Sequence, residues 1–66
     1  MAIAIVGNGT RKEFQTDDIR DGARMAFEEA RDVKKCFDTF DAQGRVIGKA
    51  TPKGFIYSPW VEGKLK

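Results

Sequence analysis

The sequence predicts an α+β fold, in which a small antiparallel sheet of two hairpins and a short C-terminal strand packs against one α-helix, in the order ββαββ plus that last strand. Two turn signals, Asn8-Gly9 and residues 41–44, each separate segments typical of strands. Between them, residues 17–34 have apolar side chains at helical spacing. With 66 residues, we expect a single domain, 1–66, with one small core.

The first hairpin centres on Asn8-Gly9, because both positions of a two-residue turn of this type need positive φ. A short apolar run precedes the turn, and residues 11–15 follow it as a more polar strand. This register places Ile3 opposite Phe14 on one face of the sheet. We expect residues 11–15 to form an exposed strand.

The helix is expected from about residue 17 to residue 34, with an N-cap and first-turn carboxylates within residues 16–18. At about 100° per residue, one side carries mainly small residues, which lets the helix lie close to a sheet: Ile19, Gly22, Ala23, Ala26, Phe27, Ala30 and Val33. The charges separate, with arginines on one flank and carboxylates on the other. This surface is either a solvated helix surface or an acidic stripe for a basic partner.

The second hairpin turns at residues 41–44, a type I turn with Asp first and Gly in the left-handed position. A bulged register predicts Phe40 opposite Val46 and Cys36 opposite Ala50 on one face, and places on the other Phe37, Thr39, Ile47 and Lys49. Both faces then carry large apolar side chains, and one helix cannot cover both. Phe37 and Ile47 are therefore expected either against the C-terminal tail or at an interface.

The C-terminal segment breaks at residues 52–54, forms a brief strand at 55–57, and ends it at Ser58-Pro59 before a polar tail. Its aromatic residues either close the core as an edge strand or leave Tyr57 and Trp60 partly exposed at an interface.

Composition restricts how so small a chain is stabilised. One cysteine and no histidine exclude an internal disulfide and a Cys/His zinc site, so we expect self-association, as a homodimer, or a tight partner. A lone thiol without a secretion signal favours the cytoplasm, and residues 1–6 are too short for a membrane span. The net charge is +2, from −2 through Asp32 and +4 from Val33 onward.

Two motifs resemble ligand sites and fail on their details. Residues 4–9 resemble the start of a dinucleotide-binding fingerprint, but Lys12 stands where the third glycine belongs. Residues 38–44 resemble a calcium loop, but Phe40 occupies a ligand position and no Glu closes the loop. We expect no cofactor and no metal.

The sequence also offers no set of residues that would form a catalytic site. Without histidine, general acid–base catalysis needs a buried carboxylate, and the pairs 17/18 and 28/29 point in different directions on a helix. Cys36 is interpreted as a small core residue, and Ser58 stands alone. We therefore expect a protein that is not an enzyme.

In size and layout, the chain resembles the small accessory proteins of phages and mobile elements, some of which, such as anti-CRISPR proteins, inhibit host defence. The resemblance implies a protein-binding inhibitor or adaptor that acts by surface occlusion. The alternative is a compact nucleic-acid-binding domain that uses the basic, aromatic C-terminal half. The expected partner-binding residues are Phe37, Ile47, Lys49, Lys53, Tyr57 and Trp60, and secondarily Arg20, Arg24 and Arg31 of the helix.

Overall fold

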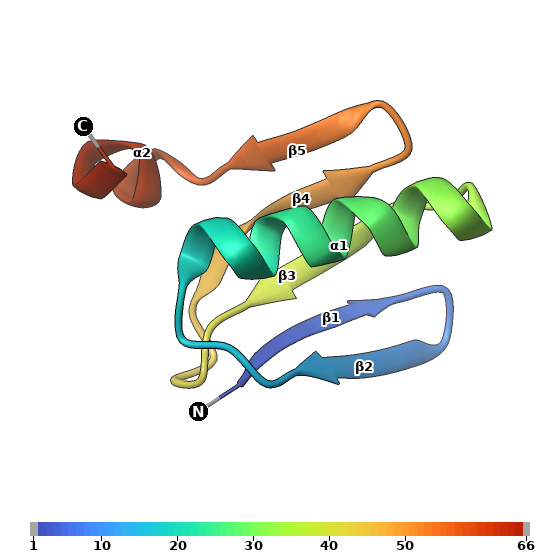
Figure 1. The fold of residues 1–66 in the computed structure, drawn as a ribbon, viewed down its shortest axis with the longest axis horizontal. Coiled ribbons are helices and arrows are strands. Elements are labelled where there is room, and N and C mark those ends of the chain that lie inside the picture. Colours follow the sequence, from blue (N-terminus) through green and yellow to red (C-terminus); the bar gives the residue numbers. More distant parts are fainter. Residues whose placement is uncertain (1, 66) are drawn as a thin grey trace.

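The computed structural model describes residues 2–65 and has one five-stranded antiparallel sheet with two helices in that range (Figure 1). The elements are β1 (Ile3–Gly7), β2 (Thr10–Phe14), α1 (Ile19–Val33), β3 (Phe37–Phe40), β4 (Val46–Thr51), β5 (Gly54–Tyr57) and α2 (Pro59–Leu65). The strand order is β2-β1-β3-β4-β5. Figure 1 shows α1 across one face of the sheet and α2 beyond the end of β5. The predicted α+β class is confirmed.

The first hairpin forms as its turn residues predict. Asn8 and Gly9 both have positive φ, 54° and 75°. Ile3 lies opposite Phe14, so the expected register is confirmed. β2 is an edge strand, and its central residues are exposed.

α1 begins after Asp18, whose carboxylate accepts a hydrogen bond from the backbone N–H of Arg20. The helix buries the small residues of the predicted stripe, which are Gly22, Ala23, Ala26 and Ala30. A Cβ at Gly22 would lie 2.3 Å from Cδ1 of Ile3, so the missing side chain lets α1 approach β1 closely. Val33 departs from the prediction: it is 43% exposed, because it is the last residue of α1 and lies past the buried stripe.

The second hairpin differs from the prediction by one residue. Phe40 lies opposite Val46 as expected, but Ala50 lies opposite Phe37 and not Cys36. The cause is a bulge, because Phe40 pairs with Val46 and Thr39 with Gly48, which leaves Ile47 as an extra residue in β4. The expectation of a core position for Cys36 is wrong, because Cys36 lies just before β3 and its thiol is free and exposed.

The C-terminal tail is helical, which the sequence analysis did not predict. Pro59 occupies the first helical position, where its missing N–H is no loss. The backbone N–H groups of Val61 and Glu62 donate to the carbonyl oxygen of Ser58, at 3.0 and 3.1 Å. Through α2, Val61 enters the core and is fully buried.

The core lies on the α1 side of the sheet, in two clusters of buried residues. One contains Ile5, Ala26, Ala30, Phe37 and Ala50. The other contains Ile3, Ile47 and Val61, and so joins β1, β4 and α2. Within residues 2–65, no helix combines the length and the apolar character needed to cross a membrane.

Candidate functional site

The candidate site is the side of the sheet opposite α1, which we call the open face. Residues directly opposite one another in neighbouring strands point to the same side, and successive residues of a strand point to opposite sides. Because Ile3, Ile5 and Phe37 belong to the core, their strand neighbours form the open face. One row across the sheet is Arg11, Val6, Asp38, Lys49 and Ile56, and the next is Glu13, Ala4, Phe40 and Val46.

Apolar side chains on the open face are exposed to solvent. Val6 is 38% exposed, Val46 45% and Ile56 64%, whereas Phe40 between them is half-buried. Among the described residues, the only other large apolar side chain with comparable exposure is Val33 of α1. The side of the sheet without a helix therefore presents exposed aliphatic side chains, and exposed apolar surface marks interaction sites.

The charged residues of the open face balance. Arg11 forms an ion pair with Glu13 two residues later in β2. Asp38 and Lys49 lie directly opposite each other on β3 and β4. Two positive and two negative side chains thus lie among the apolar residues, so the open face is not selective for a strongly charged ligand.

A hollow of about 300 Å³ lies at one end of the open face. Its lining combines small residues of β1 with longer side chains of β2 and β3 and with the β3–β4 turn, namely Ala2, Ala4, Val6, Arg11, Glu13, Phe40, Asp41, Ala42 and Gly44. Ala4 of β1 and Ala2 before it are small residues beside the longer side chains of Arg11, Glu13 and Phe40, which leaves the hollow open. Its position beside the exposed valines makes it suited to receive an apolar side chain of a bound molecule.

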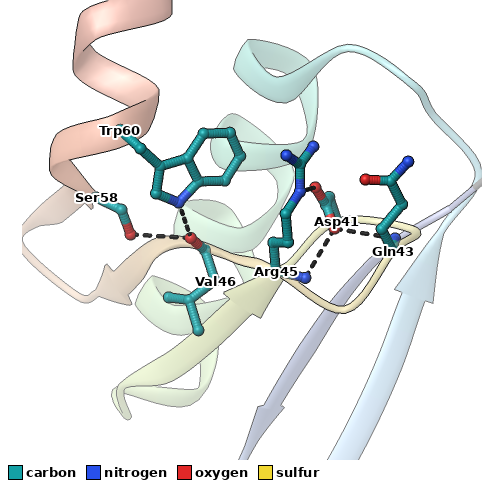
Figure 2. A network of polar contacts seen from close by, with 6 residues as sticks. All are labelled: Asp41, Gln43, Arg45, Val46, Ser58 and Trp60. Atoms are coloured by element: carbon teal, nitrogen blue, oxygen red, sulfur yellow. Dashed lines mark hydrogen bonds and ion pairs between the residues drawn. The ribbon is translucent and has the colours of Figure 1, made fainter.

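The turn beside the hollow is held by Asp41 (Figure 2). Its carboxylate accepts hydrogen bonds from the backbone N–H groups of Gln43 and Arg45 and from Nε of Arg45, each at 2.9 Å. Burial raises the pKa of Asp41, but the hydrogen bonds from Arg45 and Gln43, with the positive charge of Arg45, outweigh it and hold the pKa below its ordinary value. The ionised carboxylate therefore fixes the wall of the hollow.

Trp60 fastens α2 to the same hairpin (Figure 2). Its Nε1 donates to the backbone oxygen of Val46 at 2.7 Å, and Oγ of Ser58 donates to the same oxygen at 3.1 Å. The guanidinium of Arg45 lies 4.6 Å from the centre of the Trp60 ring, and Nζ of Lys64 lies at 5.6 Å. The half-buried indole is thus engaged within the chain.

The structure does not gather the sequence-predicted binding residues into one surface. Phe37 is buried with Ala26 and Ala30 of α1, so the expectation that it contacts the tail or an interface is wrong. Ile47 is buried with Val61 and Trp60 and thus takes the expected place against the tail. Both side chains therefore belong to the core on the α1 side of the sheet.

Of the other expected residues on the sheet, Lys49 belongs to the open face, while Lys53 is exposed in the β4–β5 turn. Tyr57 is half-buried on the α1 side and meets Phe55 edge-on, with ring centres 5.0 Å apart.

The helix arginines lie on α1, across the sheet from the open face. Arg24 pairs with Asp21 and Glu28, at 3.3 and 3.7 Å. The guanidinium of Arg31 lies 5.6 Å from the centre of the Phe27 ring. Arg20 is exposed in the first turn. These contacts are those of a solvated helix surface with ion pairs between residues three and four apart.

Sequence reasoning missed the aliphatic members of the open face: Val6, Val46 and Ile56. Strand alternation was the available signal. It places Val6 on the opposite side from Ile5, and Ile56 on the opposite side from Phe55 and Tyr57.

No protein-family model, curated protein or solved structure matches this chain. Among residues 2–65, no group of three or more Cys, Asp or Glu side chains is placed to hold a metal ion.

Proposed function

We propose that this chain is a non-catalytic protein-binding module that covers a surface of its partner with the open face. The observation that carries the proposal is the exposure of Val6, Val46 and Ile56 on the side of the sheet away from α1. The two longer dimensions of the molecule, 29 and 23 Å, limit this face to less than the roughly 800 Å² per partner of a standard interface. A partner bound here must therefore cover nearly all of it.

The chemistry of the open face indicates what the partner offers. An apolar side chain of the partner enters the hollow beside Val6 and Phe40, and a rim of mixed charges surrounds it. Steric occlusion by a covered face suits an inhibitor or adaptor of the kind that small phage and mobile-element accessory proteins provide.

The proposal includes a homodimer that works in the cytoplasm. A chain of 66 residues has a small core and gains stability when a second copy covers apolar surface. The thiol of Cys36 is free and exposed, which suits a reducing compartment.

Nucleic-acid binding receives less support from the same geometry. Base stacking needs exposed aromatic faces, but Phe55 and Tyr57 pack against the core and Trp60 is held by Val46 and Arg45. Phosphate binding needs a positive surface, but the charges of the open face balance.

Capture from the native host tests the proposal with two matched variants. Val46→Lys places a charge on the open face, and Val33→Lys places the same charge at nearly equal exposure on α1, 45% against 43%. We expect Val46→Lys to remove the proteins that the wild type retains, by quantitative mass spectrometry, and Val33→Lys to keep them. Circular dichroism checks that both are folded. Equal retention by all three proteins would contradict the proposal.

A further inference from the structure

The two edges of the sheet differ in chemistry. β2 carries Arg11, Lys12 and Glu13 in sequence, and Nζ of Lys12 is paired with Glu29 of α1 at 2.9 Å. β5, at the other edge, has the sequence Gly-Phe-Ile-Tyr and no charged residue. Charged side chains on an edge oppose pairing with another strand, whereas an uncharged apolar edge favours it. β5 is thus the edge suited to pair.

The direction of the β5 backbone follows from one hydrogen bond. The N–H of Ser58 donates to the carbonyl oxygen of Ile47 in β4, at 2.9 Å. In an antiparallel ladder, every second residue turns its N–H and C=O toward the same neighbour. Ile56 therefore faces β4, and Phe55 and Tyr57 turn their backbone N–H and C=O groups outward.

We infer that β5 pairs antiparallel with β5 of a second copy, about a two-fold axis at Ile56. This register places Ile56 opposite Ile56 of the second copy, and Phe55 opposite the second copy's Tyr57. Both outward-facing residues then exchange backbone hydrogen bonds across the junction, which matches the alternation of an antiparallel ladder. The inference supplies the interface for the homodimer in the proposed function, and it rests on that part of the proposal.

The strand that pairs with β5 is that of a second copy, because β5 is complementary to itself in this register. The two isoleucines, each 64% exposed in the single chain, cover one another across the axis on the open face. On the α1 side, the aromatic contact between Phe55 and Tyr57 continues into the second copy. Pairing joins the two sheets into one and places both open faces on the same side, where they bind two sites at once.

Sedimentation equilibrium of the complete protein tests the inference through the mass in solution. The wild type is expected to be a dimer, and Ile56→Lys, which places two like charges opposite each other, to weaken dimerisation about tenfold or more. Val46→Lys lies on the open face but not on β5 and is expected to remain dimeric. A wild type that stays monomeric at high micromolar concentration, or an Ile56→Lys protein as dimeric as the wild type, would overturn it.

Oxidation of single-cysteine variants tests the register itself. In a Cys36→Ser background, Ile56→Cys places two thiols directly opposite each other, where Cβ atoms about 4.5 to 5.5 Å apart approach disulfide geometry. We expect a disulfide-linked dimer from this variant and slow cross-linking from Val46→Cys in the same background. Equal rates would contradict the pairing. A wild type that is monomeric and still captures its partner would count against this inference alone, whereas capture that survives Val46→Lys would count against the open face.

Discussion

Thr39 provides a sharp test of how the core is built. Its side chain is fully buried on β3, and its hydroxyl oxygen has no hydrogen-bond partner among the described residues. Buried polar atoms without a partner are rare in folded proteins, because leaving water without a compensating bond is costly. Thr39→Val replaces the hydroxyl with a methyl group of similar size and removes this cost.

The expected gain is about 1 to 2 kcal/mol, within the roughly 1 to 3 kcal/mol that an unpaired buried polar group costs in proteins. With an m-value of about 1 kcal/mol/M for so small a domain, the urea midpoint rises by roughly 1 to 2 M. The thermal midpoint rises by about 4 to 8 °C per kcal/mol. Both transitions are measured at one fixed protein concentration, because a dimer couples stability to concentration.

Thr51 supplies the matched control. Its hydroxyl donates to the backbone oxygen of Gly54 at 2.7 Å and accepts from the N–H groups of Lys53 and Gly54, at 3.2 and 3.1 Å. Thr51→Val removes these bonds and is expected to lower stability by about 1 kcal/mol. The same substitution is thus expected to raise stability at one position and to lower it at the other. A lower urea midpoint for Thr39→Val, or the same sign for both variants, would refute the reasoning.

The pKa of Asp41 is held below its ordinary 3.8 in the folded state, so its charge stabilises the fold above that pH, and this contribution is lost as the pH falls through the folded pKa. Between pH 6 and pH 3, the urea midpoint of Asp41→Asn is therefore expected to fall less than that of the wild type. An equal fall for both proteins would contradict this. Gly48→Ala places a Cβ 2.4 Å from the carbonyl oxygen of Ile56 and is expected to lower the free energy of unfolding, measured in urea, by about 1 to 3 kcal/mol. At Gly63 an added Cβ meets nothing within 4 Å, so Gly63→Ala is expected to leave the fold as stable as the wild type. Equal urea midpoints for the two variants would count against close packing at Gly48. The pair Lys49→Glu and Lys53→Glu is expected to leave retention on immobilised nucleic acid and its salt dependence unchanged, and a loss of retention would favour the alternative function.

Sequence reasoning succeeded where the determinants are local. Asn8-Gly9 specify their own turn through positive φ, and that turn sets the register of the first hairpin. The buried stripe of α1 follows from its periodicity, and its N-cap lies within the predicted residues. The turn of the second hairpin likewise fixes the pairing of Phe40 with Val46.

Sequence reasoning failed where contacts between residues distant in sequence determine the structure. The bulge at Ile47, which packs with Ile3 and Val61, shifts the pairing of the rest of the hairpin by one residue, so that Ala50 lies opposite Phe37 and not Cys36. α2 is short, and its attachment through Trp60 to the Val46 carbonyl exists only after the hairpin has formed.

The site proposed from the structure differs from the sequence-predicted residues for a related reason. Aromatic residues are enriched at binding hot spots, which favoured Phe37, Tyr57 and Trp60 in the sequence analysis. A chain with so small a core uses its large side chains internally, so the exposed apolar surface consists of aliphatic residues such as Val46 and Ile56. Lys49 is the one expected binding residue that the structure places on the open face.

The central claim is that the open face contacts a protein partner, and site-specific photo-crosslinking in native cells tests it most directly. A photoreactive phenylalanine analogue replaces Val46 on the open face or Val33 on α1, two positions of nearly equal exposure. We predict a covalent adduct heavier than two copies of this chain from position 46 and none from position 33. Adducts of equal yield from both positions, or only self-adducts from position 46, would contradict the claim.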